Sequence, residues 1–146
     1  MDGNDPVSGD RRLWGRRERF KAEGTLREGI RPQIARSWVR SRKSGVRADG
    51  DPVAGAAAFD PETWLLRVAR PILDRLADEI QTADMTVILT DPRGLVLDRR
   101  AGSSSLLRGL DRVLLAPGHF YSEETVGTNG IGTAAEDRRP AWIVGS

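Results

Sequence analysis

The chain lacks cysteine, and this absence excludes several classes of protein. Without thiols it forms no disulfide, carries no thiolate nucleophile and builds no zinc site on sulfur ligands. Histidine is nearly absent too: His119 is the only one, which excludes a metal site made of several histidines. A lone histidine between Gly118 and Phe120 is typical of a loop residue. We therefore expect no catalytic residue, no bound metal and no cofactor.

Long apolar runs are also missing. No segment approaches the roughly 18 apolar residues that span a bilayer, and the N-terminus lacks the apolar core of a signal peptide. We expect no membrane association and a cytoplasmic location. Because only 38% of residues are hydrophobic and 5% aromatic, the sequence predicts one ordered region with a disordered tail at 1–12 and a polar linker at 47–58.

Lysine is scarce, and the basic residues are unevenly placed. Residues 1–50 hold 13 Lys or Arg against 7 Asp or Glu, whereas residues 51–146 hold 10 against 14. Clustered arginines favour contact with nucleic acid, because they neutralise phosphates. However, 21 of the 23 basic residues are Arg, which indicates a compositional bias, so direct DNA binding is not expected. A basic module at residues 11–47 that binds DNA or a partner regulator remains the alternative.

Residues 13–46 predict a basic helical segment. Ile30, Ile34 and Trp38 recur every four residues, which places them on one face of a helix over 27–44. The rest of this helix is basic, and a solvated surface is its expected role: Arg31, Arg36, Arg40, Arg42 and Lys43.

The strongest helical pattern lies in residues 60–82. Asp60 is the expected N-cap, and Pro71 is expected to kink the helix. The apolar residues form a broad stripe: Trp64, Leu65, Val68, Ala69, Ile72, Leu73, Leu76, Ala77 and Ile80. Covering a sheet is the expected role of this stripe, and a homodimer through the same helix is the alternative.

Two short runs of strand composition, residues 85–90 and 94–98, predict a β-hairpin. They flank Asp91-Pro92-Arg93, which has the composition of a turn. Residues 141–145 have strand composition as well. A hairpin alone is marginally stable, so further partners are needed to complete an antiparallel sheet. Helices combined with such a sheet predict an α+β fold.

The glycine-rich stretch at 122–135 (SEETVGTNGIGTAA) allows three interpretations. Residues 130–135 match the G-x-G-x-x-A pattern of dinucleotide-binding turns, but a polar, acidic segment precedes them where that pattern requires a hydrophobic strand. Alternatively, Asn129-Gly130 suits a two-residue hairpin turn. The neighbouring Gly127 and Gly132 would weaken both of the flanking strands.

The third interpretation is structural, and we favour it. Ser122 caps a first turn whose acidic residues suit the helix dipole, and Gly127 ends that turn. Thr128 then caps a second short helix, whose small residues let it pack closely against a neighbouring sheet. In this interpretation Glu123 and Glu124 serve the helix dipole, because adjacent carboxylates on a helix point in different directions and make a poor acid/base pair.

Four separated stretches together resemble one family. They are IARSWVRSRKSGV at 34–46, WLLRVARPILDRLADEI at 64–80, VILTDPRGLVLDRR at 87–100 and YSEETVGTNGIGTAAEDRRPAWIVG at 121–145. In order and spacing they are similar to the N-terminal sensory region of the acetoin-catabolism-regulator family of sigma-54-dependent transcriptional activators, a region that contains a GAF domain. The matching motif residues, for which the family suggests a structural role, are Ser37, Trp38, Arg40, Ser41, Ser122, Glu123, Gly127, Thr128, Asn129, Ile131, Gly132 and Thr133.

The resemblance implies a fold and a function. Residues 59–146 are expected to form a partial GAF-like sensor domain, in which the hairpin 87–100 is backed by the helix 60–82. The family's GAF pocket binds a small-molecule effector that controls a downstream ATPase. The candidates for lining such a pocket are Phe120, Tyr121, Thr128 and Trp142, although the aromatic ones could equally be core residues.

The chain departs from the family in what it contains. Family members continue into further strands, an ATPase and a DNA-binding helix-turn-helix. These 146 residues contain no G-x-x-x-x-G-K-[ST] motif, so ATP-driven promoter opening is not encoded in them. The expectation is therefore a truncated relative, a gene fragment or a wrongly bounded reading frame that retains the sensory region alone.

Overall fold

The computed structural model describes residues 29–46 and 60–141, together with residues 15, 19, 20, 22, 23, 57, 58 and 143. The predicted tail at 1–12, most of the linker at 47–58 and most of the strand at 141–145, including Trp142, lie outside the described residues. The helices are α2 (Pro32–Lys43), α3 (Trp64–Ile80), α4 (Ser104–Arg112), α5 (Glu123–Val126) and α6 (Gly130–Asp137), and the strands are β1 (Thr86–Thr90) and β2 (Val96–Ala101).

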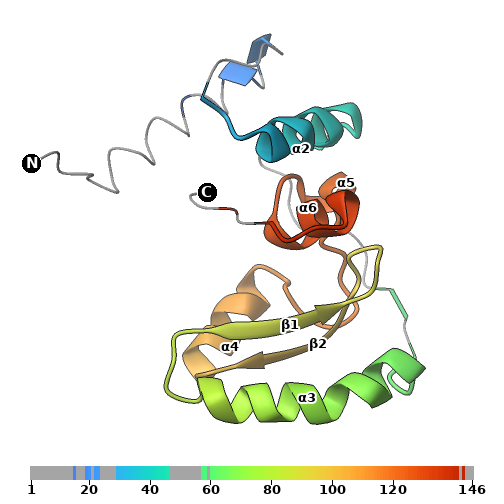
Figure 1. Cartoon of the computed structure of the whole chain (residues 1–146), viewed down its shortest axis with the longest axis vertical. Coiled ribbons are helices and arrows are strands. Elements are labelled where there is room, and N and C mark those ends of the chain that lie inside the picture. Colours follow the sequence, from blue (N-terminus) through green and yellow to red (C-terminus); the bar gives the residue numbers. More distant parts are fainter. Residues whose placement is uncertain are drawn as a thin grey trace, which may run out of the picture.

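The described part of the chain has an α+β fold, as predicted. Its two strands form one antiparallel sheet, and α3 packs against both of them. At the other end of the molecule, α2 packs against α5 and α6 (Figure 1). None of the helices among the described residues is long and apolar enough to cross a membrane.

The predicted hairpin is confirmed, with a shifted second strand. β1 and β2 run antiparallel, but β2 begins at Val96 rather than at residue 94. The side chain of Asp91 is the reason, because its Oδ1 accepts hydrogen bonds from the backbone N–H groups of Arg93 at 2.8 Å and Leu95 at 2.9 Å. These bonds hold residues 91–95 in a turn and delay the start of the strand.

Residues 118–121 give the sheet a further edge that the sequence did not reveal. Val96 N–H donates to the His119 carbonyl at 2.9 Å, and Gly118 N–H donates to the Val96 carbonyl at the same distance. Leu95 and Phe120 form an antiparallel bridge. The start of β2 and the two residues before it are thus held by residues 118–121, which supplies part of the support that an isolated hairpin lacks.

The pairing of β1 with β2 is interrupted by a β-bulge at Leu97. Leu89 is opposite Asp98 and Thr90 is opposite Val96, so Leu97 is the extra residue. Leu97 packs with Leu66 of α3 in the core. After the bulge the pairing is regular from Asp98 to Ala101, and two consecutive arginines follow on the strand.

The two arginines after the bulge tie β2 to different helices. Arg99 donates to the carbonyl of Leu115 at 2.7 Å and forms an ion pair with Asp111 of α4. Arg100 pairs with Asp74 of α3 at 3.1 Å. Successive side chains of a strand point to opposite faces, so α3 and α4 are held on opposite sides of the hairpin, as Figure 1 shows.

Helix α3 begins later in the sequence than its pattern predicted, and a different set of its residues is buried against the sheet. Its N-cap is Thr63, whose hydroxyl accepts from Leu66 N–H at 3.4 Å, while Asp60 forms a separate turn by accepting from Glu62 N–H at 2.8 Å. The prediction of Asp60 as the cap is therefore wrong, and the helix continues through Pro71 to Ile80.

The predicted apolar stripe of α3 is only half correct. The buried residues are Leu66, Leu73 and Ile80, which recur every seven positions and so lie on one face of the helix. Trp64, Val68 and Ile72 were assigned to the same stripe but are 74%, 51% and 58% exposed. One face of α3 covers the sheet, and a second apolar face points to solvent.

Candidate functional site

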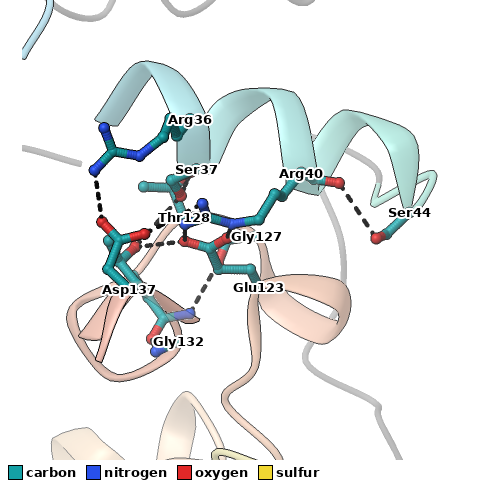
Figure 2. A network of polar contacts seen from close by, with 11 residues as sticks. Arg36, Ser37, Arg40, Ser44, Glu123, Gly127, Thr128, Gly132 and Asp137 are labelled. Atoms are coloured by element: carbon teal, nitrogen blue, oxygen red, sulfur yellow. Dashed lines mark hydrogen bonds and ion pairs between the residues drawn. The ribbon is translucent and has the colours of Figure 1, made fainter. Parts of the chain in front are cut away.

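The two sequence motifs of the resemblance meet in space. The SW-x-RS motif lies on α2, and the SE-x-x-x-GTN-x-IGT motif forms α5 and α6, more than 80 residues later in the chain. Figure 2 shows polar side chains of α2 pointing into these two short helices. We call this set of contacts the Arg40–Glu123 network, and its members are Arg36, Ser37, Arg40, Glu123, Thr128, Thr133 and Asp137.

A buried bidentate ion pair lies at the centre of the network. Arg40 Nε lies 2.5 Å from Glu123 Oε2, and Arg40 Nη2 lies 3.0 Å from Glu123 Oε1. Glu123 is 1% exposed, whereas the side chain of Arg40 retains 29% of its exposure. A buried carboxylate is costly unless it is both paired and hydrogen-bonded, so the burial of Glu123 depends on α2 being in place.

Hydroxyl groups complete the coordination of this carboxylate. Thr133 donates to Glu123 Oε1 at 2.7 Å, and its Oγ1 also lies 3.3 Å from Ser37 Oγ. Ser37 in turn donates to Thr128 Oγ1 at 2.7 Å. Ser37 and Thr133 are fully buried. The interface between α2 and the C-terminal helices is therefore polar at its centre.

Asp137, at the end of α6, forms the outer part of the network. Its two carboxylate oxygens contact different arginines of α2: Oδ2 lies 3.0 Å from Arg36 Nη2, and Oδ1 lies 3.3 Å from Arg40 Nη1. Arg40 is thus shared by two carboxylates. The expectation of a solvated basic face is wrong for Arg40, which is mostly buried and paired with two carboxylates, whereas Arg36 forms an ion pair but remains 57% exposed.

The charges in the network shift the pKa values of its members. Burial raises the pKa of Glu123, but hydrogen bonds from Arg40 and Thr133, together with the charge of Arg40, outweigh burial and hold that pKa below its ordinary value. The hydrogen bond from Arg36 lowers the pKa of Asp137, and the hydrogen bond to Glu123 raises that of Arg40. All three groups are therefore stabilised in their charged forms.

The apolar side of α2 packs elsewhere. Trp38 is buried, and its ring stacks on Phe20 with centroids 5.5 Å apart. The helix predicted over 27–44 begins only at Pro32, so Ile30 lies in a bend before it and is not part of a helical face with Trp38. The helix presents one face to Phe20 and another, polar, face to Glu123 and Asp137.

The glycine-rich motif follows the predicted helix–break–helix order, but both predicted caps differ. Ser122 precedes α5 without a capping hydrogen bond from its side chain, which contacts the Thr125 hydroxyl instead. α5 begins after Ser122 and ends at Gly127, whose φ of +76° is accessible mainly to glycine. The cap of α6 is Asn129, not Thr128: Asn129 Oδ1 accepts from Gly132 N–H at 2.8 Å. Thr128 lies one residue before this cap, and its hydroxyl accepts from Ser37 of α2 instead.

Gly132 allows α5 and α6 to approach each other. A Cβ atom at this position would lie 2.7 Å from the backbone nitrogen of Glu123 and 3.0 Å from the carbonyl carbon of Ser122. The close packing predicted for this helix is thus made against the start of α5 and not against the sheet. The short separation brings Thr133 within hydrogen-bonding reach of the Glu123 carboxylate.

The structure places the pocket candidates in two regions. Phe120 packs on the core formed by Leu66, Leu95 and Leu97. The hydroxyl of Tyr121 donates to the carbonyl of Val113, the residue after α4. Thr128 belongs instead to the Arg40–Glu123 network, and Trp142 lies outside the described residues. Across the described part of the chain, no cluster of three or more His, Asp or Glu could hold a metal ion.

Comparison with known proteins assigns this arrangement to a family. The family model described as "MimR, N-terminal domain" matches residues 10–146. The chain belongs to the MimR N-terminal domain family. The resemblance to the N-terminal sensory region of sigma-54-dependent transcriptional activators is therefore confirmed.

Two relatives within this group of regulators give the scale of the similarity. The chain is 42% identical over 131 residues to the propane 2-monooxygenase operon transcriptional activator MimR of Mycolicibacterium smegmatis, covering 89% of this chain and 22% of that protein. It is 32% identical over 148 residues to the acetoin dehydrogenase operon transcriptional activator AcoR of Bacillus subtilis, covering 96% and 24%. The chain thus spans about a quarter of the length of these curated relatives. No solved structure matches it.

Two features of the network do not follow from the sequence patterns. Those patterns assign Glu123 to the helix dipole, yet it is the most deeply buried charge in the described part of the chain. Asp137 was not singled out at all. The sequence did contain one signal for these ion pairs: Arg36 and Arg40 are one helical turn apart, so they share a face of α2.

Replacing Glu123 tests the ion pair. In Glu123→Gln the shape of the side chain is retained, but the partly buried Arg40 loses its bidentate partner and keeps only Asp137. Breaking a buried pair by removing one partner costs several kcal/mol. Because Arg40 is partly exposed, we expect a loss of about 2 kcal/mol in the free energy of unfolding at neutral pH, measured by urea denaturation. The exposed neighbour supplies a matched control, since Glu124→Gln should leave this free energy unchanged.

The same network predicts a loss of stability in acid. The pKa of Glu123 is lower in the folded chain than in the unfolded chain, where it is about 4.3, so the unfolded state binds more protons in this range. The stabilisation is fully present above the unfolded pKa and is lost as the pH falls through the folded pKa. Urea denaturation from about pH 6 to about pH 3 should show a shallower loss for Glu123→Gln than for the wild type. Equal pH slopes would contradict the assignment.

Two glycines of α6 give a matched pair of substitutions. Gly132→Ala places a methyl group against the backbone of α5 and should lower the free energy of unfolding by about 1–3 kcal/mol. Gly130→Ala meets nothing within 4 Å and should be neutral or slightly stabilising. Hydrogen exchange of the α2 amides should accelerate in Gly132→Ala alone. Comparable effects in the two variants would show that the close approach of α5 and α6 is unimportant.

Proposed function

We propose that the chain is the signal-sensing region of a bacterial transcriptional activator, acting in the cytoplasm, and that it binds a small-molecule effector. The observation that carries this proposal is the match to the N-terminal quarter of activators named for two different operons, those of propane 2-monooxygenase and acetoin dehydrogenase. Propane and acetoin are both small and uncharged. An effector of the same class, a small ketone, alcohol or hydrocarbon, is the corresponding expectation for this chain.

The proposed fold of residues 59–146 is a partial GAF-like sensor domain. An antiparallel sheet in which residues 118–121 hold the start of β2, with α3 on one face, supports it. The hairpin 87–100 backed by the helix 60–82 is the arrangement that the family resemblance implies. Residues 13–46 would then form a separate regulatory segment, of which α2 is the part that contacts the sensor.

The proposed effector site lies beside residues 118–121. Phe120 contributes an apolar ring next to β2, and the Arg93 guanidinium lies 5.7 Å from its centroid. Tyr121 contributes a phenol that is neutral at physiological pH; burial raises its pKa further, and its hydroxyl donates to the Val113 carbonyl. Phe120 packs on the α3 side of the hairpin, whereas Tyr121 reaches the residue that follows α4. Helix α4 carries half-buried leucines: Leu106, Leu107 and Leu110. An apolar lining with a single phenol suits an uncharged ligand that has one polar group.

A short covalent path joins this site to α2. Only Ser122 separates Tyr121 from Glu123, and Tyr121 is fixed to the sheet because its N–H donates to the Gly94 carbonyl at 2.8 Å. A ligand that moves Tyr121 therefore moves the start of α5 and with it the carboxylate that holds Arg40. Release or tightening of α2 is the proposed output of effector binding. The two states then differ in contacts that a ligand can bias.

Effector binding is tested by thermal unfolding of the 146-residue chain with a panel of small ketones, alcohols and aromatic compounds. A ligand present at about one hundred times its Kd stabilises the folded state by about 2.7 kcal/mol, which is a shift of several degrees in Tm. Hydrogen exchange of the α2 amides should change with the same compound. A panel that shifts neither Tm nor exchange would count against effector sensing.

Variants locate the effector site. Tyr121→Phe removes the hydroxyl and Phe120→Leu reduces the ring, so both should diminish the Tm shift caused by an active compound. Met85→Leu, at an exposed position just before β1, should preserve it. A shift that is unaffected by Phe120→Leu and Tyr121→Phe would place the effector elsewhere.

The alternative of a basic module that binds DNA through residues 11–47 is weakened by the network. Arg36 and Arg40, two of the basic residues of α2, neutralise acidic side chains within the chain. Phosphate contacts made by the remaining residues would give an affinity that falls steeply with salt, with a slope of about −0.9 per contact in the logarithm of the association constant. We expect no such binding by fluorescence anisotropy at physiological salt. A steep salt dependence would favour the alternative.

A further inference from the structure

Ser41 is the last residue of the SW-x-RS motif, and its side chain has no part in the Arg40–Glu123 network. It lies one helical turn after Ser37, so the two share a face of α2. Ser37 donates a hydrogen bond to Thr128. The Oγ atom of Ser41 is buried as well, but it has no hydrogen-bond partner among the described residues. Buried polar groups without a partner are rare in folded proteins, so this one calls for a physical explanation.

The residue of the C-terminal helices that lies nearest to this hydroxyl offers it no partner. That residue is Gly127, where a Cβ atom would lie 4.0 Å from Ser41 Oγ. Its N–H donates to the Glu123 carbonyl at 3.1 Å, and its carbonyl accepts from Asn129 Nδ2 at 2.8 Å. The φ of +76° disfavours any residue with a side chain at position 127. The surface against which α2 docks therefore faces Ser41 with backbone groups that are already engaged.

Helix α2 itself does not satisfy the hydroxyl either. A serine in a helix can donate to the carbonyl four residues earlier. Ser44 does so, since its Oγ donates to the Arg40 carbonyl at 3.2 Å (Figure 2). Ser41 does not make the corresponding bond to the carbonyl of Ser37. Docking of α2 therefore removes the Ser41 hydroxyl from water without replacing its hydrogen bonds, and release of α2 would hydrate it again.

We propose that Ser41 keeps the docking of α2 marginal, because its buried hydroxyl adds a cost to the docked state that the released state does not carry. An unsatisfied buried hydroxyl costs its full desolvation penalty. This cost offsets part of the stabilisation that the Arg40–Glu123 network gives to the docked state. The two states therefore come closer in free energy, and a ligand needs less differential affinity to exchange them. The use of this balance as a switch rests on the proposed function, whereas the balance itself is measured without any effector.

Ser41→Ala tests the cost in the 146-residue chain without ligand. Alanine removes the hydroxyl and leaves the rest of the side chain in place, so the docked state should become more populated. The α2 amides that exchange through release of the helix should then exchange at least about fivefold more slowly than in the wild type. Equal or faster exchange would overturn the proposal, because it would show that the hydroxyl has a favourable partner such as a buried water.

A matched pair of variants at an exposed position measures the effect of helix propensity alone. Alanine favours helices more than serine does. Lys43 is exposed in the last turn of α2, so Lys43→Ala and Lys43→Ser differ in propensity but not in a buried hydroxyl. Their α2 exchange rates should differ by no more than about threefold. A difference as large as the one caused by Ser41→Ala would attribute that result to propensity and overturn the proposal.

A background in which α2 is released separates an effect on docking from an effect on the helix. Arg40→Ala removes the bidentate pair with Glu123, so the α2 amides should lose most of their protection. Adding Ser41→Ala to this variant should slow exchange no more than the Lys43 pair predicts, because the hydroxyl is already hydrated. A full gain in this background would overturn the proposal. A panel of compounds that reveals no effector would leave all of these rates unchanged, so the two proposals fail separately.

Discussion

The buried carboxylate of Glu123 is the constraint on which the arrangement of α2, α5 and α6 depends. A carboxylate removed from water is tolerated only when a cation and hydrogen-bond donors surround it. Arg40 and Thr133 meet this requirement from two different helices. The C-terminal helices therefore bury the charge of Glu123 at little cost only when α2 is docked in one register. A shift of α2 by one helical turn would take Arg40 out of reach of the carboxylate. In some proteins, buried polar or ionic groups fix the register between packed helices.

The glycines of the C-terminal motif serve this carboxylate. Gly127 turns the chain sharply after a single helical turn, and Gly132 lets the next helix approach the backbone of Glu123. Without either, Thr133 would not reach the carboxylate. Residues 130–135 match the spacing of a dinucleotide-binding pattern. In this chain their small residues instead let α6 pack against the start of α5, at the protein's own Glu123.

The features that the sequence predicted depend on residues close together in the chain, whereas the features it missed depend on residues far apart in the chain. The hairpin, the end of α5 at Gly127 and the second short helix were predicted because turn formers and glycines act on their own neighbours. The partnership of Arg40 with Glu123 crosses 83 residues, and local pattern cannot distinguish a solvated arginine from one that is paired far away. The pairing of Gly118–Tyr121 with β2 was missed for the same reason, because its composition is that of a loop.

The polar character of the α2 interface matters for regulation. The stabilisation of a helix held by apolar contacts falls gradually as apolar area becomes exposed, so a small displacement removes little of it. A bidentate ion pair depends on the distance and angle of two parallel hydrogen bonds, so a small movement of Glu123 removes much of its stabilisation. Tyr121 is two residues away and is fixed to the hairpin through Gly94. A modest shift at the proposed effector site would therefore be converted into docking or release of a whole helix, which is the type of two-state element that a sensory region requires.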